Sequence, residues 1–324
     1  NDPPPPPAPP PDDPGGELAP PPPPPPPAPV LVEIPPSVRL LDPGAAPRQT
    51  LRYQLRPGAA EYVELDMKMT IAMAMKDTMM GAMSRTTEMP TIRTALRLAV
   101  VDLASDGEAR IVFDLDNVDV LSDVAIEPAV RTALETELAG MVGMRGSSRM
   151  STRGAQSEIV FELPNASPSM KNHLDGMRDS IRHMYVLFPE EPVGPGARWE
   201  TTSRFPTTGG MLWDRKASCT LVRLTGTTTE IDVQLELSAP RQAMQLPPGS
   251  TGVLESLDGK GGGKVSIPLR QLATTGNMKL ATDAAFTVTT KASSVSMTMK
   301  VTADLSTRQG KPARRPVSPR DPAR

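Results

Sequence analysis

Apolar and polar residues alternate without a break from Val63 to Met75. Every second residue of this stretch is apolar, and the residues between are polar or small. A period of two over thirteen residues predicts a β-strand with one buried face and one face in water. At about 3.3 Å per residue such a strand is roughly 40 Å long, which is typical of strongly curved sheets and barrels.

The same alternation predicts more strands further along the chain. A partner strand is expected to start near Thr91, and Asp106-Gly107 predicts a type I′ hairpin turn before a third strand. Later stretches with alternating apolar residues are Ile159–Leu163, Ala217–Leu221, Ile231–Leu237, Val265–Leu269, Phe286–Val288 and Val295–Leu305. We expect antiparallel strands joined mainly by hairpins, with a further short strand at Leu51–Leu55.

Two segments change to the helical period. Pro128 suits the first turn of a helix over Glu127–Val142, and Ser167-Pro168 caps a second helix. The second helix carries one apolar stripe, formed by Met170, Leu174, Met177, Ile181 and Met184. A one-sided stripe packs against another surface. The predicted fold class is therefore mainly β (α+β): a long-stranded antiparallel curved sheet or open half-barrel, with two helices covering its concave face.

The two ends of the chain differ in composition from the rest. Of the 39 prolines, 18 fall in the first 29 positions, which predicts an extended polyproline II spacer, with a proline-rich recognition ligand as the alternative. Ser306–Arg324 holds six Lys or Arg residues and one Asp. We predict a disordered proline-rich spacer over 1–47, an apolar lead-in over 30–41, the sheet domain over 48–307 and a disordered basic tail over 308–324.

Composition also bears on partners and compartment. The net charge of −2 gives no general attraction for nucleic acid. The sequence contains no run of eighteen apolar residues, so we predict no transmembrane segment. Cys219 is the only cysteine, so an internal disulfide is excluded and a buried role on a strand is expected. Because the chain starts at Asn1 without Met, we expect that a signal peptide has been removed.

The search for catalytic and metal-binding residues gives no candidate. His173 and His183 lie ten residues apart, whereas metal-binding pairs on a helix lie three or four apart. No G-x-S-x-G stretch is present, and the glycine-rich stretch 259–264 lacks the Ser or Thr of a phosphate loop, so it is read as a flexible loop. The acidic residues Asp114, Asp116, Asp119 and Asp123 do not fit a calcium loop and are expected on a wet strand face. We predict a non-enzymatic protein without metal or cofactor, with carboxylate-only chemistry left open.

Methionine is the most informative residue type. The chain has 19, and eight lie between Met67 and Met89. Thioethers bind Cu(I), and the Met79–Met83 cluster keeps that alternative open, but flexible inward-facing methionines also suit a cavity for acyl chains. The candidate ligand-binding residues are Met67, Met69, Met73, Met170, Leu174, Met177, Ile181, Met297 and Met299.

The order of parts resembles a known kind of protein. Phe188-Pro189, Pro192-Val193-Gly194, Gly196 and Trp199, supported by 261–269, look like an uncharacterised family of bacterial envelope proteins, often lipoproteins. The sheet of that family is similar to the curved half-barrel of lipid and lipoprotein carriers of the LolA and LppX type. The resemblance implies a cell-envelope location: periplasm, outer-membrane anchored, or secreted.

Together these features predict a non-enzymatic envelope protein, lipoprotein-like, that binds a lipid, another hydrophobic small molecule or a protein partner between sheet and helices. The alternative is a structural or interaction module with a solid core, whose tails contact the envelope surface.

Overall fold

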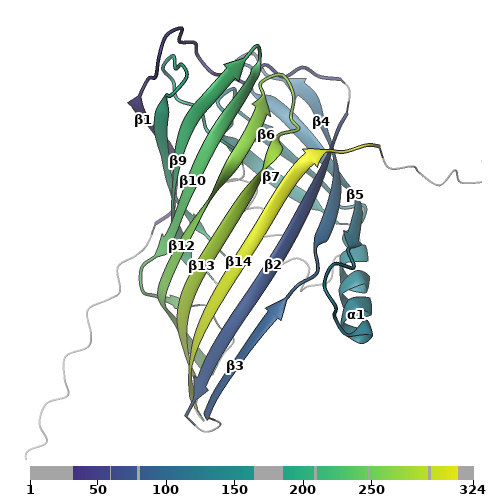
Figure 1. Cartoon of the computed structure of the whole chain (residues 1–324), viewed down its shortest axis with the longest axis vertical. Helices are drawn as coiled ribbons and strands as arrows, with labels where there is room; N and C mark the ends of the chain where they lie inside the picture. The colour runs from purple at the N-terminus through teal and green to yellow at the C-terminus, as the bar shows by residue number, and fades with distance from the viewer. Residues whose placement is uncertain are drawn as a thin grey trace, which may run out of the picture. The chain divides into compact units, whose positions relative to one another are not determined.

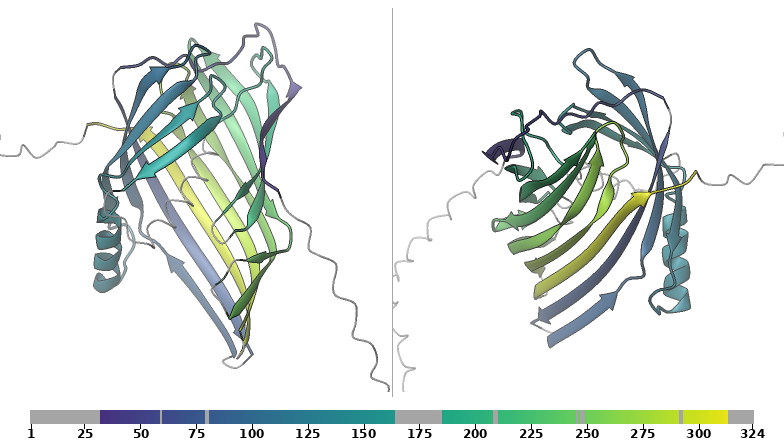
Figure 2. Two further views of the ribbon diagram at one scale, coloured as in Figure 1. Left: turned by 180° about the vertical axis from the view of Figure 1, so that it is seen from behind. Right: turned by 45° about the horizontal axis from the view of Figure 1, so that its top comes forward.

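The described part of the chain forms one curved sheet. The computed structural model describes residues 32–58, 60–78, 81–163, 185–207, 210–244, 246, 249–290 and 293–312, all within the compact unit Leu31–Arg324. These residues contain fourteen strands in a single antiparallel sheet that curves strongly without closing, and one α-helix (Figures 1 and 2). The prediction of a mainly β, antiparallel, open curved sheet is confirmed.

The first half of the chain supplies β1 at one edge of the sheet and the strands of the opposite side. They are β1 (Ile34–Asp42), β2 (Glu61–Asp77), β3 (Gly81–Glu88), β4 (Ile92–Leu103), β5 (Ala109–Val120), β6 (Arg145–Met150) and β7 (Gln156–Glu162). The second half supplies β8 (Arg198–Pro206), β9 (Leu212–Thr225), β10 (Thr228–Ala239), β11 (Gln242–Met244), β12 (Ser250–Pro268), β13 (Thr275–Thr290) and β14 (Ser294–Gln309).

The longest strands lie next to one another. The strand order is β1-β8-β9-β10-β12-β13-β14-β2-β4-β5-β6-β7, with β11 paired to β12 and β3 paired to β2. β12, β13, β14 and β2 are 19, 16, 16 and 17 residues long, and they adjoin in that order. The chain therefore builds one broad surface from segments that are far apart in sequence.

The long alternating strand and its neighbour need one correction. β2 contains all of Val63–Met75, as predicted, and β4 starts at Ile92, close to Thr91. However, β4 pairs only with the first part of β2, from Glu61 to Met67, and β3 pairs with the last part, from Thr70 to Asp77. β3 was missed because its Ala, Ser and Thr residues give no apolar alternation.

Three other segments also differ from the prediction. The lead-in 30–41 contains most of β1, which pairs with β8, so the folded part starts well before the predicted boundary at residue 47. The segment 51–55 buries Leu51, Tyr53 and Leu55 but is not a strand. At the turn before β5, only Gly107 has a positive φ, of 85°, whereas a type I′ turn requires positive φ at both central residues.

The glycine-rich stretch 259–264 lies inside β12 and is not a loop. A Cβ atom on Gly263 would lie 1.9 Å from the carbonyl oxygen of Asn277 on β13, and one on Gly261 would lie 2.5 Å from that of Lys279. The backbones of β12 and β13 therefore approach too closely for side chains at these positions. Glycine at these positions permits the close approach and favours bending of the sheet. It does not mark the flexible loop that was predicted.

One helix is present in the described residues, where two were predicted over the whole chain. α1 (Pro128–Ala139) matches the first prediction, with Pro128 at its start. The second predicted helix falls on 164–184, outside the described residues. α1 buries none of its residues and lies beside β5 (Figure 1). The expectation that this helix covers the concave face is therefore wrong, because its stripe is too short and too exposed to require such a partner.

The main core fills the inner side of the sheet at one end. Its largest fully buried side chains include Trp199, Phe188 and Leu51, and the Trp199 indole N–H donates to the carbonyl oxygen of Leu187 at 2.9 Å. The Phe188–Trp199 segment therefore contributes core residues as well as connecting strands. Gly194 is required there, because a Cβ would lie 1.8 Å from the carbonyl oxygen of Ala45.

Candidate functional site

The inner face of the long strands carries the predicted methionines of the described region. Met73 lies opposite Met299, while Met67 lies opposite Leu305. Met69 lies opposite Ala303, and Met297 lies opposite Phe286. These side chains share the face of β2 and β14 that also carries the buried Val63, so the structure gathers five of the nine predicted site residues on one apolar surface.

This surface becomes less covered toward the end of β2. Val63 is 8% exposed, whereas Met73 is 36% exposed and Met83, on β3, is 60% exposed. Met297 and Met299 are partly buried against a second, smaller core formed by Met211, Leu254, Leu257, Ala284 and Phe286. The inner face is thus solid near Val63 and accessible near Met73.

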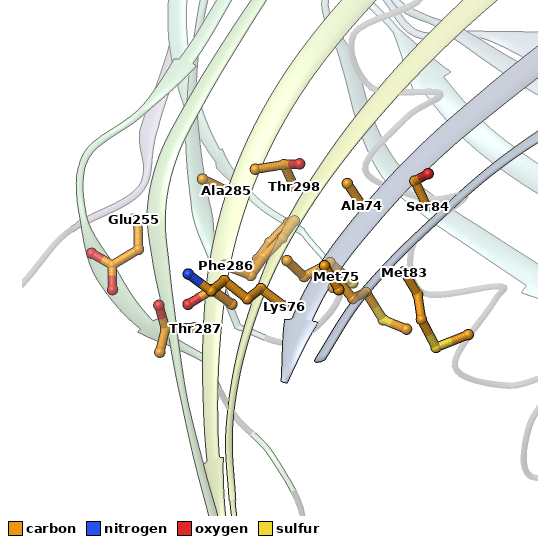
Figure 3. Close-up of a pocket in the computed structure, with 13 residues that line it drawn as sticks. Ala74, Met75, Lys76, Met83, Ser84, Glu255, Ala285, Phe286, Thr287 and Thr298 are labelled. Atoms are coloured by element: carbon orange, nitrogen blue, oxygen red, sulfur yellow. The ribbon is translucent and has the colours of Figure 1, made fainter. Parts of the chain in front are cut away.

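Two hollows adjoin this end of the sheet. One of about 500 Å³ is bordered by Met75, Met83, Met297 and Phe286 together with the smaller Ala74, Ser84 and Thr298 (Figure 3). The other, of about 420 Å³, is bordered mainly by small and polar residues that alternate with the methionines. Since neighbouring residues on a strand point to opposite faces, both hollows are chiefly grooves on the outer face, formed where Ala, Ser and Thr leave space.

Several predicted residues fall outside the described region. They are Met170, Leu174, Met177 and Ile181 of the ligand set, His173 and His183, and Met79 and Met80 of the methionine cluster. Met83, the described member of that cluster, is exposed on β3. The copper alternative and the role of the second helix therefore stay predictions.

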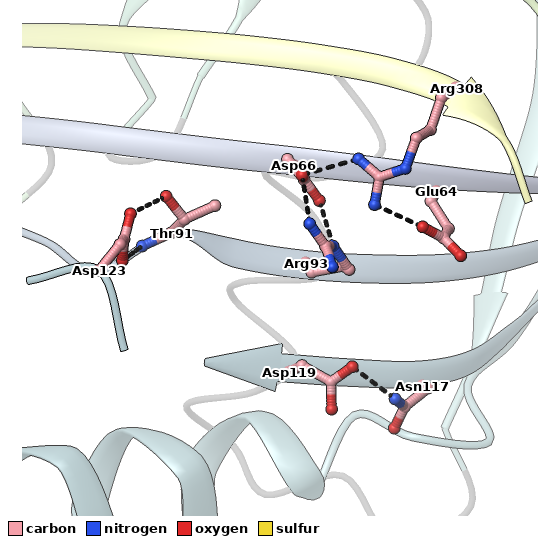
Figure 4. Close-up of polar contacts among 8 residues, drawn as sticks. All are labelled: Glu64, Asp66, Thr91, Arg93, Asn117, Asp119, Asp123 and Arg308. Atoms are coloured by element: carbon pink, nitrogen blue, oxygen red, sulfur yellow. Dashed lines mark hydrogen bonds and ion pairs between the residues drawn. The ribbon is translucent and has the colours of Figure 1, made fainter. Parts of the chain in front are cut away.

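The acidic residues of β5 and the turn after it bind protein groups. Asp114 accepts a hydrogen bond from Arg97 at 2.7 Å and lies 3.4 Å from Arg145. Asp119 accepts one from Asn117, and Asp123 accepts two from Thr91 (Figure 4). Protein groups therefore hold these three carboxylates along β5 and the turn after it.

No group of three or more potential His, Cys, Asp or Glu metal ligands occurs among the described residues. Cys219 is buried at 3% exposure on β9, and burial raises the pKa of its thiol to about 12, so it is a neutral core group. Within the same residues, no helix has the length and apolarity needed to cross a membrane.

The inner face also contains a polar group of residues that the sequence reasoning did not single out. Arg215 of β9 lies opposite Ser203 of β8, and Trp213 lies two residues before Arg215 on the same face. The Ser203 hydroxyl and the Trp213 indole N–H are buried without a hydrogen-bond partner among the described residues. The available signal was Arg215 itself, a charged residue in line with the apolar positions Ala217, Cys219 and Leu221.

Comparison with models of known families, with curated proteins and with solved structures found no match to this chain. The resemblance to envelope carriers therefore stays a prediction.

Proposed function

We propose that this protein is a non-enzymatic binding protein that holds an apolar chain, such as the acyl chain of a lipid, against the inner face of β2 and β14. The observation that carries the proposal is the gradient in cover along one continuous apolar face, from buried Val63 to Met73 at 36% exposure. Exposed apolar surface that continues from a core is typical of ligand grooves.

Methionine suits this role. Its unbranched thioether side chain adopts many shapes, so a surface lined by it accommodates chains of varied length and branching. Met73 and Met299 face each other across β2 and β14, and Met75 and Met297 form the next such pair toward the end of the strands. The two pairs offer a continuous strip along which an extended hydrocarbon chain would lie.

A cell-envelope location is part of the proposal: periplasm, outer-membrane anchored, or secreted. It is supported by the proline-rich head and by the resemblance described above.

Native mass spectrometry of the full chain, purified without detergent and followed by organic extraction, tests the proposal. We expect one lipid mass per chain. A matched pair of variants then locates the ligand, because Met73 and Ala74 are adjacent but face opposite sides of β2. Met73→Glu is expected to abolish lipid retention, since it places a charge on the apolar strip, whereas Ala74→Glu is expected to retain it.

A second candidate is the structural or interaction module with a solid core. It is favoured by the main core, in which Trp199, Phe188, Leu51 and Leu221 are all fully buried. Repeated preparations with a clean protein mass, and no lipid in the extract, would contradict the binding proposal and favour this module.

A further inference from the structure

The strongest feature not absorbed by the proposed function is the polar group on the inner face of β8 and β9. Arg215 has no hydrogen-bonding or ion-pairing side chain among the described residues, and the hydroxyl of Ser203 and the indole N–H of Trp213 are buried and unpaired. Arg215 is only partly buried, but buried polar groups in folded proteins are nearly always hydrogen-bonded, so the two unpaired donors beside it require an explanation.

The nearby carboxylates do not neutralise Arg215. Asp214 and Glu200 lie on the opposite face of the sheet, because they alternate with the inner residues of β9 and β8. Asp214 accepts hydrogen bonds from Arg204 at 2.8 and 2.9 Å. Glu200 forms ion pairs with Arg39 and Lys216. Arg215 therefore brings an uncompensated positive charge to an otherwise apolar face.

Among the described residues, Cys219 lies four residues after Arg215 on the same face of β9 and interacts with it electrostatically. Its thiol stays neutral at physiological pH, as shown above, so it does not balance the charge. Arg215 is partly buried, and this burial lowers the pKa of its guanidinium. Arginine nevertheless remains protonated in proteins, so the charge persists.

Strand register connects this cation to the methionine strip. Across the sheet, Arg215 lies opposite Leu237, Leu237 opposite Gly259, and Gly259 opposite Thr282. The row then continues through Val301 to Ile71 of β2. Ile71 lies between Met69 and Met73, so Arg215 lies on the same inner face and in the same row as the proposed acyl site, five strand-to-strand steps away from it.

Trp213, two residues before Arg215 on the same face of β9, also links the polar group to the methionine strip. It packs against the second core, as do Met297 and Met299. Its indole therefore joins the polar group to the apolar strip, with an apolar ring against the core and an N–H that lacks a partner.

We propose that Arg215, Ser203 and Trp213 bind the anionic head group of a single-chain amphiphile whose hydrocarbon chain lies along Met73 and Met299. This inference rests on the proposed function and names its ligand class. The guanidinium would pair with the carboxylate or phosphate oxygens, and the hydroxyl and indole N–H would donate to the same group. Each unpaired donor would then acquire the acceptor that the chain itself does not supply.

Three ligands with the same sixteen-carbon chain test the head group: hexadecanoate, hexadecyl phosphate and the uncharged hexadecanol. Binding to the full chain is measured by isothermal titration calorimetry below the micelle-forming concentration. We expect at least one of the two anions to bind about tenfold or more tightly than hexadecanol, as a charged hydrogen-bonded pair implies. A preference for hexadecanoate over hexadecyl phosphate identifies a carboxylate ligand, and the reverse identifies a phosphate ligand.

Arg215→Met tests the residue, because methionine keeps an unbranched side chain of similar length but removes the charge. The variant is expected to bind hexadecanol as the native protein does and to lose the preference for the anions. Arg223→Met is the matched control, since Arg223 lies on the same strand, is exposed and pairs with Glu230. It is expected to keep the preference.

The outcomes separate the two proposals. Equal binding of hexadecanol and both anions by the native protein, or an anion preference that survives Arg215→Met, would overturn the head-group site and leave the acyl site standing. Failure of the native protein to bind any of the three ligands would overturn both. If Arg215→Met unfolds, Arg215→Lys serves instead, and it should weaken anion binding through loss of the bidentate geometry while leaving hexadecanol binding unchanged.

Discussion

Asp66 is the most densely paired charge on the outer face of β2. Its carboxylate accepts hydrogen bonds from Arg93 at 2.7 and 2.8 Å and from Arg308 at 2.8 Å, and Arg308 also pairs with Glu64 (Figure 4). These contacts tie β2 to β4 on one side and to β14 on the other. The hydrogen bonds from Arg93 are the largest cause that lowers the pKa of Asp66, from 3.8 to about 2.

A depressed carboxyl pKa makes stability depend on acid in a defined direction. In the unfolded chain the Asp66 carboxyl takes up a proton near pH 3.8, whereas in the folded protein it stays ionised down to about pH 2. The contribution of Asp66 to folding stability is therefore full above pH 3.8 and is lost as the pH falls toward 2. We expect the free energy of unfolding to fall by about 1 to 2 kcal/mol over this window through Asp66, allowing for solvent around the guanidinium groups. Asp66→Asn should remove that part of the pH dependence.

Urea unfolding at pH 6 and at pH 3 measures this effect. Asp304→Asn is a suitable control, because Asp304 is more than half exposed and lies 3.4 Å from Lys279, a surface pair of little expected energy. If the native protein and Asp66→Asn lose the same free energy between the two pH values, the assignment of this acid sensitivity to Asp66 is wrong.

At the scale of elements, the bend of the sheet depends on β12. Gly263→Ala would place a Cβ atom 1.9 Å from the backbone oxygen of Asn277, whereas Gly259→Ala would meet the side-chain methyl of Thr282 at 2.8 Å. A side chain moves more readily than a paired strand. We expect Gly263→Ala to destabilise the protein by about 1 to 3 kcal/mol, and Gly259→Ala to cost clearly less.

Thermal and urea unfolding of both variants, side by side, measure the difference. Equal loss in the two variants would show that glycine acts in β12 through general strand propensity and not through close approach of β12 and β13.

The same strand shows why only part of the fold follows from the sequence. Alternation of apolar residues found β2, β4, β10 and β14, because each carries apolar side chains on one face and polar or small ones on the other. It did not find β1 or β3, and it misread 259–264, because pairing there depends on backbone hydrogen bonds and close approach, which leave no periodic side-chain signal. The methionine strip was predictable from that periodicity. The position of Arg215 relative to that strip was not predictable, because four strands lie between β9 and β2 and together set their register.

At the scale of the whole sheet, burial falls off along β2, although the strand is paired on both sides in its first and in its last part. Its first part pairs with β4, which contains the buried Leu98 and Val100, while its last part pairs with β3, in which no residue is buried. Local opening is easiest where few apolar contacts are lost. Hydrogen exchange should therefore be fast in β3 and in β2 from Thr70 to Asp77, and slow in β9 and β10.

Ligand binding should change that gradient in one place. A chain held along Met73 and Met299 adds apolar contacts to the least stable part of the sheet, so it should slow exchange in the second half of β2 and in the facing part of β14. The main core around Trp199 is already closed and should exchange as before. Hydrogen-exchange mass spectrometry with and without the tightest-binding sixteen-carbon ligand measures both parts. Protection that appears in β9 and β10 but not in β2 would place the ligand elsewhere. Protection in β2 and β14 is what a chain on the inner face of the long strands requires, and an anionic ligand should add protection at the start of β9, around Trp213 and Arg215.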